Sequence, residues 1–473
     1  MSTIMRSRRP PVGVWAILAG CLLAAVGCSS GGSDDSSGGS GPTSEAGGTS
    51  VATTADTSNT ADTDVTIATS AAPSSTEVAL TATDTGVTAD SIKLGLALID
   101  FQQLADIGVD LDAGDVNAQW EGWAEQLNAS GGINGRRLDI VIEEFLPVGN
   151  ETSLAACIAL TEDEHVFMAL GQLFGDNPVC FTKDHETPYL SYYGASEELA
   201  AQSIAPLIAT GMSGEDALRA SVRVFIDEGF GAGKRIGVEY PAIASEIMEG
   251  EILPMLEDAG LDIVATLVSE DFAGDTQAAS AAAAVGIQKL RDAGVDMLVS
   301  PSSVYGLMVA LQANEFAPQV VLFSGDATNG GSFDAGGIDP AYIEDAIAIT
   351  PDNPTREEMQ ADPKILECID AYNASDPEEP LDPSEMSTGN LRATAQNCAA
   401  FQLFVAAATA AGPDLTAESL LRAAEQLGTI QLAGFANASL GPDKHSAGDS
   451  MRIYEWDPTA QDLLPVGGPI DVS

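Results

Sequence analysis

The chain has 473 residues, which is too long for one ordinary hydrophobic core and suggests two or more lobes. Its formal net charge is −51, and 16 of the 19 basic and 61 of the 70 acidic residues follow residue 90, so that part carries −45. Nucleic acid and anionic membrane surfaces would repel such a chain, which argues against both as partners.

The N-terminus, residues 1–27, has the layout of a secretory signal. Three arginines precede an apolar run over residues 12–26, which is too short for a comfortable transmembrane span. Two cysteines, Cys21 and Cys28, end apolar tetrads that resemble a bacterial lipobox. We favour Cys28 as the lipidated residue because a full-length apolar core precedes it. Cys21 is the alternative because its tetrad matches the consensus better, and a plain secretory signal is the third possibility.

Residues 28–87 consist mostly of Ser, Thr, Gly, Ala and Asp, with no aromatic side chain. Such a segment cannot bury enough apolar area to offset the entropy of ordering it, so we expect it to be disordered. A flexible chain of this length spans on the order of 40 Å. We therefore predict a tether between a lipid anchor and a globular body.

The body begins with a pattern typical of a parallel βαβ unit over residues 92–144. An apolar run, Ile92 to Ile99, is followed by a polar loop and by Asp115, which can cap a helix. The turn Asn134-Gly135 then leads into an alternating apolar and charged strand. Because ligands bind beyond the carboxyl ends of parallel strands, we expect the loop after Ile99 to line a binding site.

The rest of the body repeats this alternation of strands and helices, which predicts parallel sheets covered by helices. Further strands are expected at residues 165–170, 188–191, 235–239, 263–267, 296–300 and 320–323. Helices are expected at residues 153–161, 215–228, 244–259, 276–293 and 305–314.

Four cysteines lie in the body, and an exported chain can keep them as two disulfides. Three pairings are possible. We favour Cys157–Cys180 and Cys368–Cys398 because each pair lies within one supersecondary unit. A zinc site is not expected, because no Cys-x₂-Cys or histidine spacing supports it.

Residues 128–143, Asn-Ala-Ser-Gly-Gly-Ile-Asn-Gly-Arg-Arg-Leu-Asp-Ile-Val-Ile-Glu, resemble the signature of the branched-chain-amino-acid-type periplasmic binding proteins. These are extracellular solute receptors of ABC importers with the type I periplasmic-binding-protein fold. The strand and loop segments of the body, the helical stretch 397–412 and residues 434–456 follow in the order of that family. The resemblance also agrees with the Cys157–Cys180 pair.

The resemblance implies an α/β fold with two lobes, each a parallel sheet flanked by helices, joined by three hinge crossovers. Lobe 1 would comprise residues 88–212 and 350–430. Lobe 2 would comprise residues 213–349 and 431–473.

The resemblance also places the ligand at the strand-end loops of both lobes. Expected ligand-binding residues are Phe101, Gln172, Phe174, Gly175, Ser191, Tyr192, Tyr193, Gly194, Ala195, Tyr240, Ser302, Tyr305 and Asp326. In relatives, small or hydroxyl residues after the two middle strands bind a ligand carboxylate. Phe174-Gly175 replaces the serine pair that relatives often have, which puts a simple branched-chain amino acid in doubt.

None of these strand-end loops contains Lys or Arg, so a dianion would meet the full negative charge of the body. We therefore predict a neutral or zwitterionic ligand. Ser191 and backbone N–H groups would bind its carboxylate, and Asp326 its ammonium group.

Enzyme motifs are missing from the sequence. It contains no Gly-x-Ser-x-Gly elbow, no phosphate-binding Gly-x₄-Gly-Lys and no paired-histidine metal motif. We therefore expect no catalysis, no cofactor and no metal ion.

The sequence thus predicts a lipid-anchored receptor on the outer face of the cell membrane. As a monomer, it would bind a small polar, amino-acid-like or amide-like solute and deliver it to ABC permease subunits. Its only membrane contact would be the lipid anchor. The alternative is a surface sensor domain of the same fold that reports its ligand to a signalling partner and transports nothing.

Overall fold

A computed structural model describes residues 79–109, 111–173, 177–270, 272, 275–328 and 337–473. The predicted signal peptide, both candidate lipidation sites, nearly all of the tether and the loop residues Phe174 and Gly175 lie outside these ranges. No helix within the described ranges is long and apolar enough to cross a membrane.

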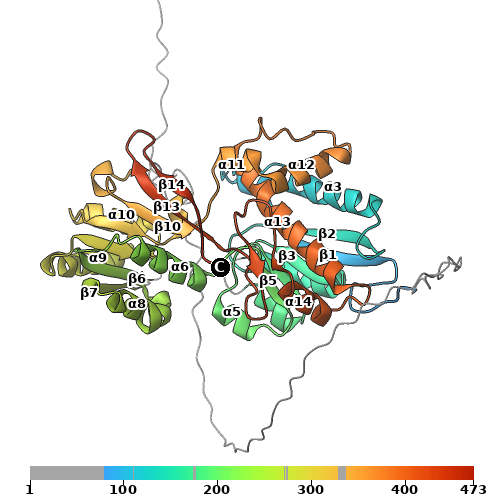
Figure 1. Cartoon of the computed structure of the whole chain (residues 1–473), viewed down its shortest axis with the longest axis horizontal. Coiled ribbons are helices and arrows are strands. Elements are labelled where there is room, and N and C mark those ends of the chain that lie inside the picture. The colour runs from blue at the N-terminus through green and yellow to red at the C-terminus, as the bar shows by residue number, and fades with distance from the viewer. Residues whose placement is uncertain (1–78, 110, 174–176, 271, 273–274, 329–336) are drawn as a thin grey trace, which may run out of the picture. The chain divides into compact units, whose positions relative to one another are not determined.

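The first lobe contains a five-stranded parallel sheet in the order β2-β1-β3-β4-β5 (Figure 1). Its strands are β1 (Ser91–Ile99), β2 (Arg137–Phe145), β3 (Met168–Gly171), β4 (Tyr189–Ser191) and β5 (Leu207–Ala209). Ala97 pairs with Gly171, Gly171 with Ser191, and Ser191 with Ala209. This register aligns the carboxyl ends of four strands at one edge of the sheet, as the alternation of strands and helices predicts.

The opening βαβ unit forms as predicted. The side chain of Asp115 accepts a hydrogen bond from the Ala118 N–H at 2.9 Å and caps α3 (Val116–Ala129). Asn134 and Gly135 have φ values of 51° and 87°, and this left-handed pair lets the chain reverse tightly between Ile133 and Arg136. Short-range signals therefore determine this unit.

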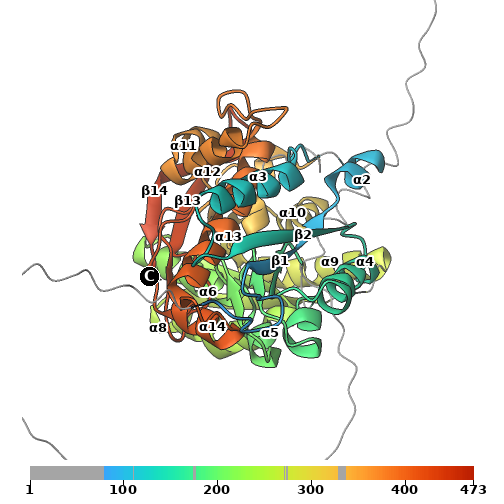
Figure 2. The same ribbon diagram turned by 90° about the vertical axis from the view of Figure 1, so that its right-hand side faces the viewer.

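Helices from two separate parts of the chain cover the first sheet. They are α2 (Phe101–Asp106), α3 (Val116–Ala129), α4 (Glu151–Ile158), α5 (Glu197–Gln202), α11 (Arg356–Ala361), α12 (Pro363–Ala374), α13 (Thr388–Ala411) and α14 (Ala417–Glu425). Two π-helical turns, η1 (Ala159–Asp163) and η2 (Cys180–Asp184), and the short pair β11 (Gly428–Thr429) and β12 (Ser439–Leu440) complete the lobe. Figure 2 shows α3 next to α12, although more than 200 residues separate them in the sequence.

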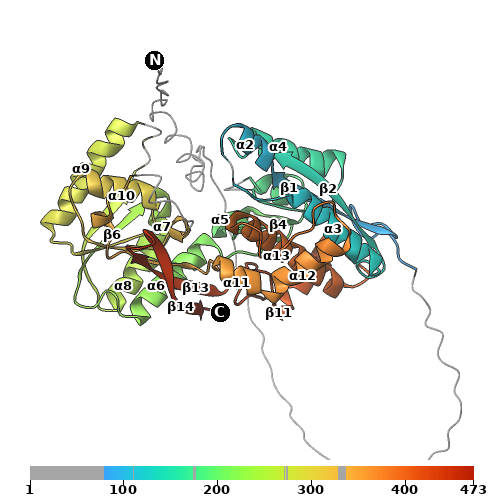
Figure 3. The ribbon, with the colours of Figure 1, turned by 90° about the horizontal axis from the view of Figure 1, so that it is seen from above.

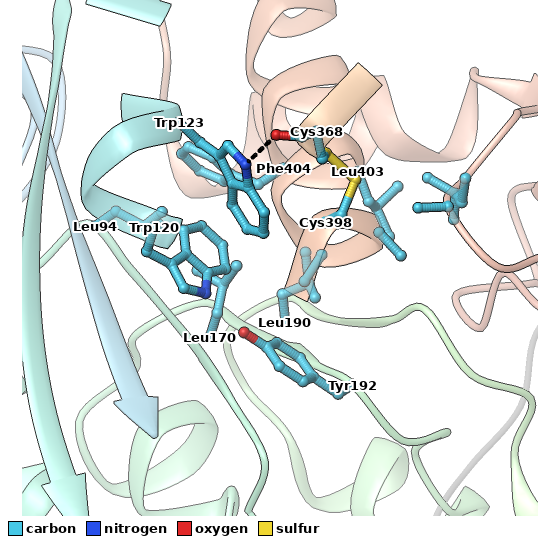
Figure 4. Packing of buried hydrophobic residues seen from close by; sticks show 14 of the residues in the cluster. Leu94, Trp120, Trp123, Leu170, Leu190, Tyr192, Cys368, Cys398, Leu403 and Phe404 are labelled. Atoms are coloured by element: carbon cyan, nitrogen blue, oxygen red, sulfur yellow. Dashed lines mark hydrogen bonds between the residues drawn. A yellow bond between two sulfur atoms is a disulfide. The ribbon is translucent and has the colours of Figure 1, made fainter. Parts of the chain in front are cut away.

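The contact between α3 and the late helices is aromatic and buried. Trp120 and Trp123 each lie within 6 Å of Phe401, measured between ring centroids. The Trp123 indole N–H donates to the Cys368 carbonyl at 2.8 Å (Figure 4). These rings cover apolar area that neither segment could bury alone.

The second lobe contains a seven-stranded sheet in the order β14-β13-β10-β9-β8-β6-β7 (Figure 1). Figure 3 shows the same lobe from above, with β6, β13 and β14 labelled. Its strands are β6 (Arg235–Pro241), β7 (Asp262–Ser269), β8 (Met297–Ser300), β9 (Gln319–Leu322), β10 (Ile347–Pro351), β13 (Ser450–Asp457) and β14 (Asp462–Asp471). Strands β6 to β10 are parallel, but β13 and β14 pair antiparallel. The sheet is therefore mixed and not purely parallel, because the chain returns to it as a C-terminal hairpin.

The helical segments of the second lobe fall between these strands. They are α6 (Gly214–Asp227), η3 (Ala242–Ala244), α7 (Ser245–Ile247), η4 (Met248–Ile252), α8 (Leu253–Asp258), α9 (Thr276–Asp292), α10 (Val304–Ala313), η5 (Gly325–Thr328) and η6 (Pro340–Tyr342).

Three crossovers join the lobes. The first follows β5 and the second follows β10. Before the third, Leu432 and Ala438 pack in the core of the first lobe, and Ala209 exchanges backbone hydrogen bonds with His445 and Ala447. We therefore place the third crossover close to Gly448, about 17 residues after the predicted boundary at 430/431.

Candidate functional site

The carboxyl edge of the first sheet carries two of the predicted residues side by side. Gln172 follows β3 and is 5% exposed, and Ser191 ends β4 and is 3% exposed. The Ser191 hydroxyl accepts a hydrogen bond from the Tyr193 N–H at 3.2 Å. Both side chains are polar and lie beside strand ends, as in the predicted site.

The loop Tyr192–Ala195 lies against the first crossover. A Cβ at Gly194 would lie 1.9 Å from the Met212 carbonyl oxygen, so no larger residue fits without a shift of the backbone. Tyr193 is 37% exposed, and Ala195 packs on the core of the first lobe. The loop thus couples the end of β4 to a hinge segment.

The Tyr192 side chain lies in the core of the first lobe (Figure 4). Its hydroxyl donates to the Asn397 Oδ1 at 2.8 Å, and the Trp120 indole N–H donates to the same oxygen at 2.7 Å. Burial raises the pKa of Tyr192 well above its usual value. This engaged, buried phenol packs in the core of the first lobe, which is the alternative role that a tyrosine pair at a strand end allows.

A cavity of about 510 Å³ lies beside β1 and β2, at the end of the first sheet where Phe101 begins α2. Asp100 caps α2, and the bond from the Gln103 N–H lowers the pKa of that carboxyl. The Asn117 amide donates to Glu144 at 2.9 Å across the same region. The loop after Ile99 therefore borders this cavity, as expected. The polar residues that line the cavity are Gln102, Asp112, Asp115, Asn117 and Glu144.

In the second lobe, Tyr240 is the next-to-last residue of β6 and is only 2% exposed. Its hydroxyl donates to Glu249 at 3.2 Å, and burial together with this carboxylate raises the pKa of Tyr240. Tyr305 is 42% exposed at the start of α10. Of these two predicted tyrosines, Tyr305 has its ring accessible.

Asp326 is engaged by the start of α10. Its Oδ2 accepts hydrogen bonds from the Ser303 hydroxyl at 3.0 Å and from the Val304 N–H at 3.1 Å. The carboxylate therefore satisfies a donor at the helix N-terminus, which competes with the predicted role in binding an ammonium group.

A buried carboxylate that the prediction missed, Glu239, lies next to Ser302. Glu239 is 3% exposed, and it accepts hydrogen bonds from the hydroxyls of Ser269, of Ser300 at 2.5 Å and of Ser302 at 3.0 Å. These serines come from β7, from β8 and from the loop after β8. The available signal was a single acid inside the apolar run of residues 236–240.

An ion cluster ties the two lobes at the second crossover. Arg452 on β13 forms an ion pair with Asp352 at 2.6 Å and donates from two nitrogens to Glu358 on α11. Arg452 is 2% exposed. Beside this cluster lies a cavity of about 170 Å³, lined by all three crossovers and by Tyr192 and Gln396.

Both predicted disulfides are confirmed. Cys157 bonds to Cys180 and Cys368 to Cys398, with Cα–Cα distances of 6.4 and 6.1 Å. Within the described ranges, one group of potential metal ligands gathers, formed by Cys157, Cys180 and His185. Its sulfurs are joined in the disulfide, so they offer no thiolate to a metal ion.

Comparison with known proteins gives a family and a fold. A family model described as periplasmic binding protein matches residues 116–462. Among curated protein sequences, none matches significantly.

Solved structures share the fold at low sequence identity. A fatty acid ABC transporter substrate-binding protein from Thermomonospora curvata is 18% identical and has a TM-score of 0.53, covering 82% of this chain and 94% of its own. An ABC transporter substrate-binding protein from Desulfitobacterium hafniense in complex with Leu is 15% identical, with a TM-score of 0.53 and coverage of 80% and 100%. A solute-binding protein from R. palustris in complex with 4-hydroxybenzoate is 13% identical, with a TM-score of 0.56 and coverage of 81% and 98%.

The matched segment spans most of both lobes, and the two sheets with three crossovers form the same architecture. The chain therefore belongs to the periplasmic binding protein family, and it has the two-lobed type I fold of that family.

Proposed function

We propose that this protein is a lipid-anchored extracellular receptor of an ABC importer. It is exported, held by a lipid on the outer face of the cell membrane, and acts as a monomer. It binds one small polar solute, amino-acid-like or amide-like, between its lobes and presents it to the permease subunits. It has no catalytic role.

The observation that carries this proposal is the polar character of the strand ends in both sheets. Gln172 and Ser191 supply amide and hydroxyl groups from the first lobe, and Ser302 and Tyr305 supply hydroxyls from the second. Strand-end loops are where ligands bind in open α/β sheets. The three crossovers allow hinged closure over such a ligand.

The solute is best identified by native mass spectrometry and calorimetry of the full-length protein against amino acids, their amides and small carboxylates. We expect one compound to bind with 1:1 stoichiometry. Tyr305→Ala should weaken that binding at least tenfold, because the exposed ring lies at the start of α10, directly after the loop that follows β8. Val309→Ala is the matched control, since it lies one turn further along α10 and is 40% exposed. Equal losses in both variants would remove Tyr305 from the site.

The lipid anchor is tested separately. Cys28→Ser should release the protein from the membrane into the medium, whereas Cys21→Ser should not. The reverse result would assign lipidation to Cys21, and retention of both variants at the membrane would contradict a cysteine anchor.

The transport role is tested by uptake of the identified solute in cells that lack this protein. Loss of uptake, restored by the intact gene, is expected of an importer receptor. Unchanged uptake, with loss of a transcriptional response to the solute, would instead favour a sensor.

A further inference from the structure

Arg392, on the second turn of α13, has no counter-charge among the described residues. No hydrogen bond or ion pair joins its guanidinium to any residue within the described part of the chain, and its Nε is buried. The two arginines that the structure buries fully, by contrast, are engaged. Arg136 donates to three backbone carbonyls, and Arg452 binds two carboxylates.

This isolation is unusual because the body carries 61 acidic residues. Burial lowers the pKa of Arg392, and the group that opposes this effect is the Tyr454 phenol. A half-buried cation without a partner costs free energy in the empty protein. Binding of a ligand anion would offset that free-energy cost. An arginine with a purely structural role would be expected to have a partner within the protein.

The position of Arg392 links it to the first lobe's strand-end loops. α13 begins beside the loop after α2: a Cβ at Gly389 would lie 2.7 Å from the Leu111 carbonyl oxygen, and one at Gly114 would lie 2.5 Å from the Asn390 side chain. One turn further along α13, Gln396 lies on the same face of the helix as Arg392. Gln396 lines the cavity of about 170 Å³ beside the Arg452 ion cluster.

On the second lobe, Tyr454 on β13 acts electrostatically on Arg392 and opposes the lowering of its pKa by burial. The Tyr454 hydroxyl bonds to the backbone of Asn353, accepting from its N–H at 3.0 Å and donating to its carbonyl at 3.2 Å. The Asn353 amide donates to the Thr328 carbonyl at 3.1 Å, in the loop after β9. Tyr454 thus connects the surroundings of Arg392 to the segment after β9, and the start of α13 connects them to the loop after α2.

We propose that Arg392 is the anion-binding residue of this protein and that its solute carries a carboxylate, which the guanidinium holds. This inference rests on the proposed function and narrows its ligand class. A planar guanidinium matches a carboxylate with two parallel hydrogen bonds. It also supplies the local positive charge that the strand-end loops lack.

The first test needs no knowledge of the natural solute. In full-length protein labelled with ¹⁵N-arginine, the Nε–Hε signals are followed during titration with sodium acetate, with acetamide and sodium chloride as controls. The signal lost in Arg392→Lys should shift saturably with acetate and with neither control. An equal shift with chloride, or a response no different from that of exposed Arg223, would overturn the assignment.

The second test compares variants. Arg392→Gln should weaken binding of the solute by about thirtyfold or more, the effect of losing one partner of a buried charged hydrogen bond. Arg392→Lys should restore part of it. Arg223→Gln, which removes the same charge from the surface, should stay within about twofold of wild type, because exposed charges are screened by solvent. Equal affinity of Arg392→Gln and wild type overturns the inference.

The stability of the ligand-free protein distinguishes a binding role of Arg392 from a structural role. Without ligand, Arg392→Gln should be at least as stable as wild type in urea, because it removes a half-buried charge that has no partner among the described residues. A clear loss of stability would indicate a structural arginine and contradict the proposal. If acetate titrates Arg392 but no solute brings the lobes together, the proposed function fails and the anion site stands. If a solute binds and Arg392→Gln binds it equally well, the proposed function stands and the assignment of the anion site to Arg392 fails.

Discussion

At the scale of single residues, Tyr192 shows how a strand-end position can serve the core. Its hydroxyl and the Trp120 indole share one acceptor, Asn397. Tyr192→Phe removes one of these two bonds but leaves the acceptor bonded. We expect a loss of about 1 kcal/mol in the free energy of unfolding, measured with urea, and unchanged solute affinity. A tenfold loss of solute affinity in a variant of unchanged stability would show that Tyr192 takes part in solute binding.

The Glu239 carboxylate accepts hydrogen bonds from three serine hydroxyls with its two oxygens. In Glu239→Gln the carboxamide offers one acceptor oxygen and presents an NH₂ donor to hydroxyls that also donate. We expect a loss of about 2 kcal/mol in unfolding free energy and weaker solute binding through displacement of Ser302.

The control for this variant is Glu246→Gln, an exposed glutamate in α7 of the same lobe. It should leave both stability and affinity unchanged. If Glu239→Gln behaves like this control, the serine cluster does not organise the strand ends.

At the scale of elements, short-range signals made the opening unit predictable. Asp115 as a cap and Asn134-Gly135 as a turn act within a few residues, so their consequences can be read from the sequence. The same holds for the local disulfides. The antiparallel edge of the second sheet was not predicted, because the pairing of β13 with β10 joins residues about 100 positions apart.

The site was less predictable than the fold. Strand-end loops could be located, but not the direction of their side chains: Tyr192 and Tyr240 turn inward, and Asp326 caps a helix. Arg392 was missed because it lies on a helix, and its lack of a partner emerges only from tertiary packing.

The disulfide Cys368–Cys398 joins α12 to α13, which carries Arg392. It closes a loop of 30 residues, so Cys368→Ala/Cys398→Ala should lower the free energy of unfolding by roughly 3–4 kcal/mol. Urea unfolding under non-reducing conditions measures this. The control is the Cys157→Ala/Cys180→Ala variant, whose slightly shorter loop should cost slightly less. No loss in either variant would contradict a stabilising role.

At the scale of the whole molecule, Arg452 ties α11 of the first lobe to β13 of the second. Burial raises the pKa of Glu358, but the bonds from Arg452 and Thr355 outweigh this effect, and its pKa lies below the usual value. A lowered pKa gives stability that is present above the unfolded value and lost as the pH falls through the folded one.

We therefore expect the stability of the wild type to fall as the pH drops from about 5 to about 3, and Glu358→Gln to flatten part of this fall. Burial raises the pKa of Asp352, so its contribution has the opposite sign and remains in the variant. Urea unfolding across this pH range provides the measurement. Identical pH profiles would show that the Glu358 bond does not contribute.

The central claim, that two lobes close over a solute, is tested most directly by the distance between them. Spin labels at Leu154 on α4 and Val285 on α9, both exposed, report one lobe each in the full-length protein. Saturation with the solute found by calorimetry should replace a broad distance distribution with a single, shorter one. Unchanged distances in the presence of a bound solute would contradict a receptor that works by hinged closure.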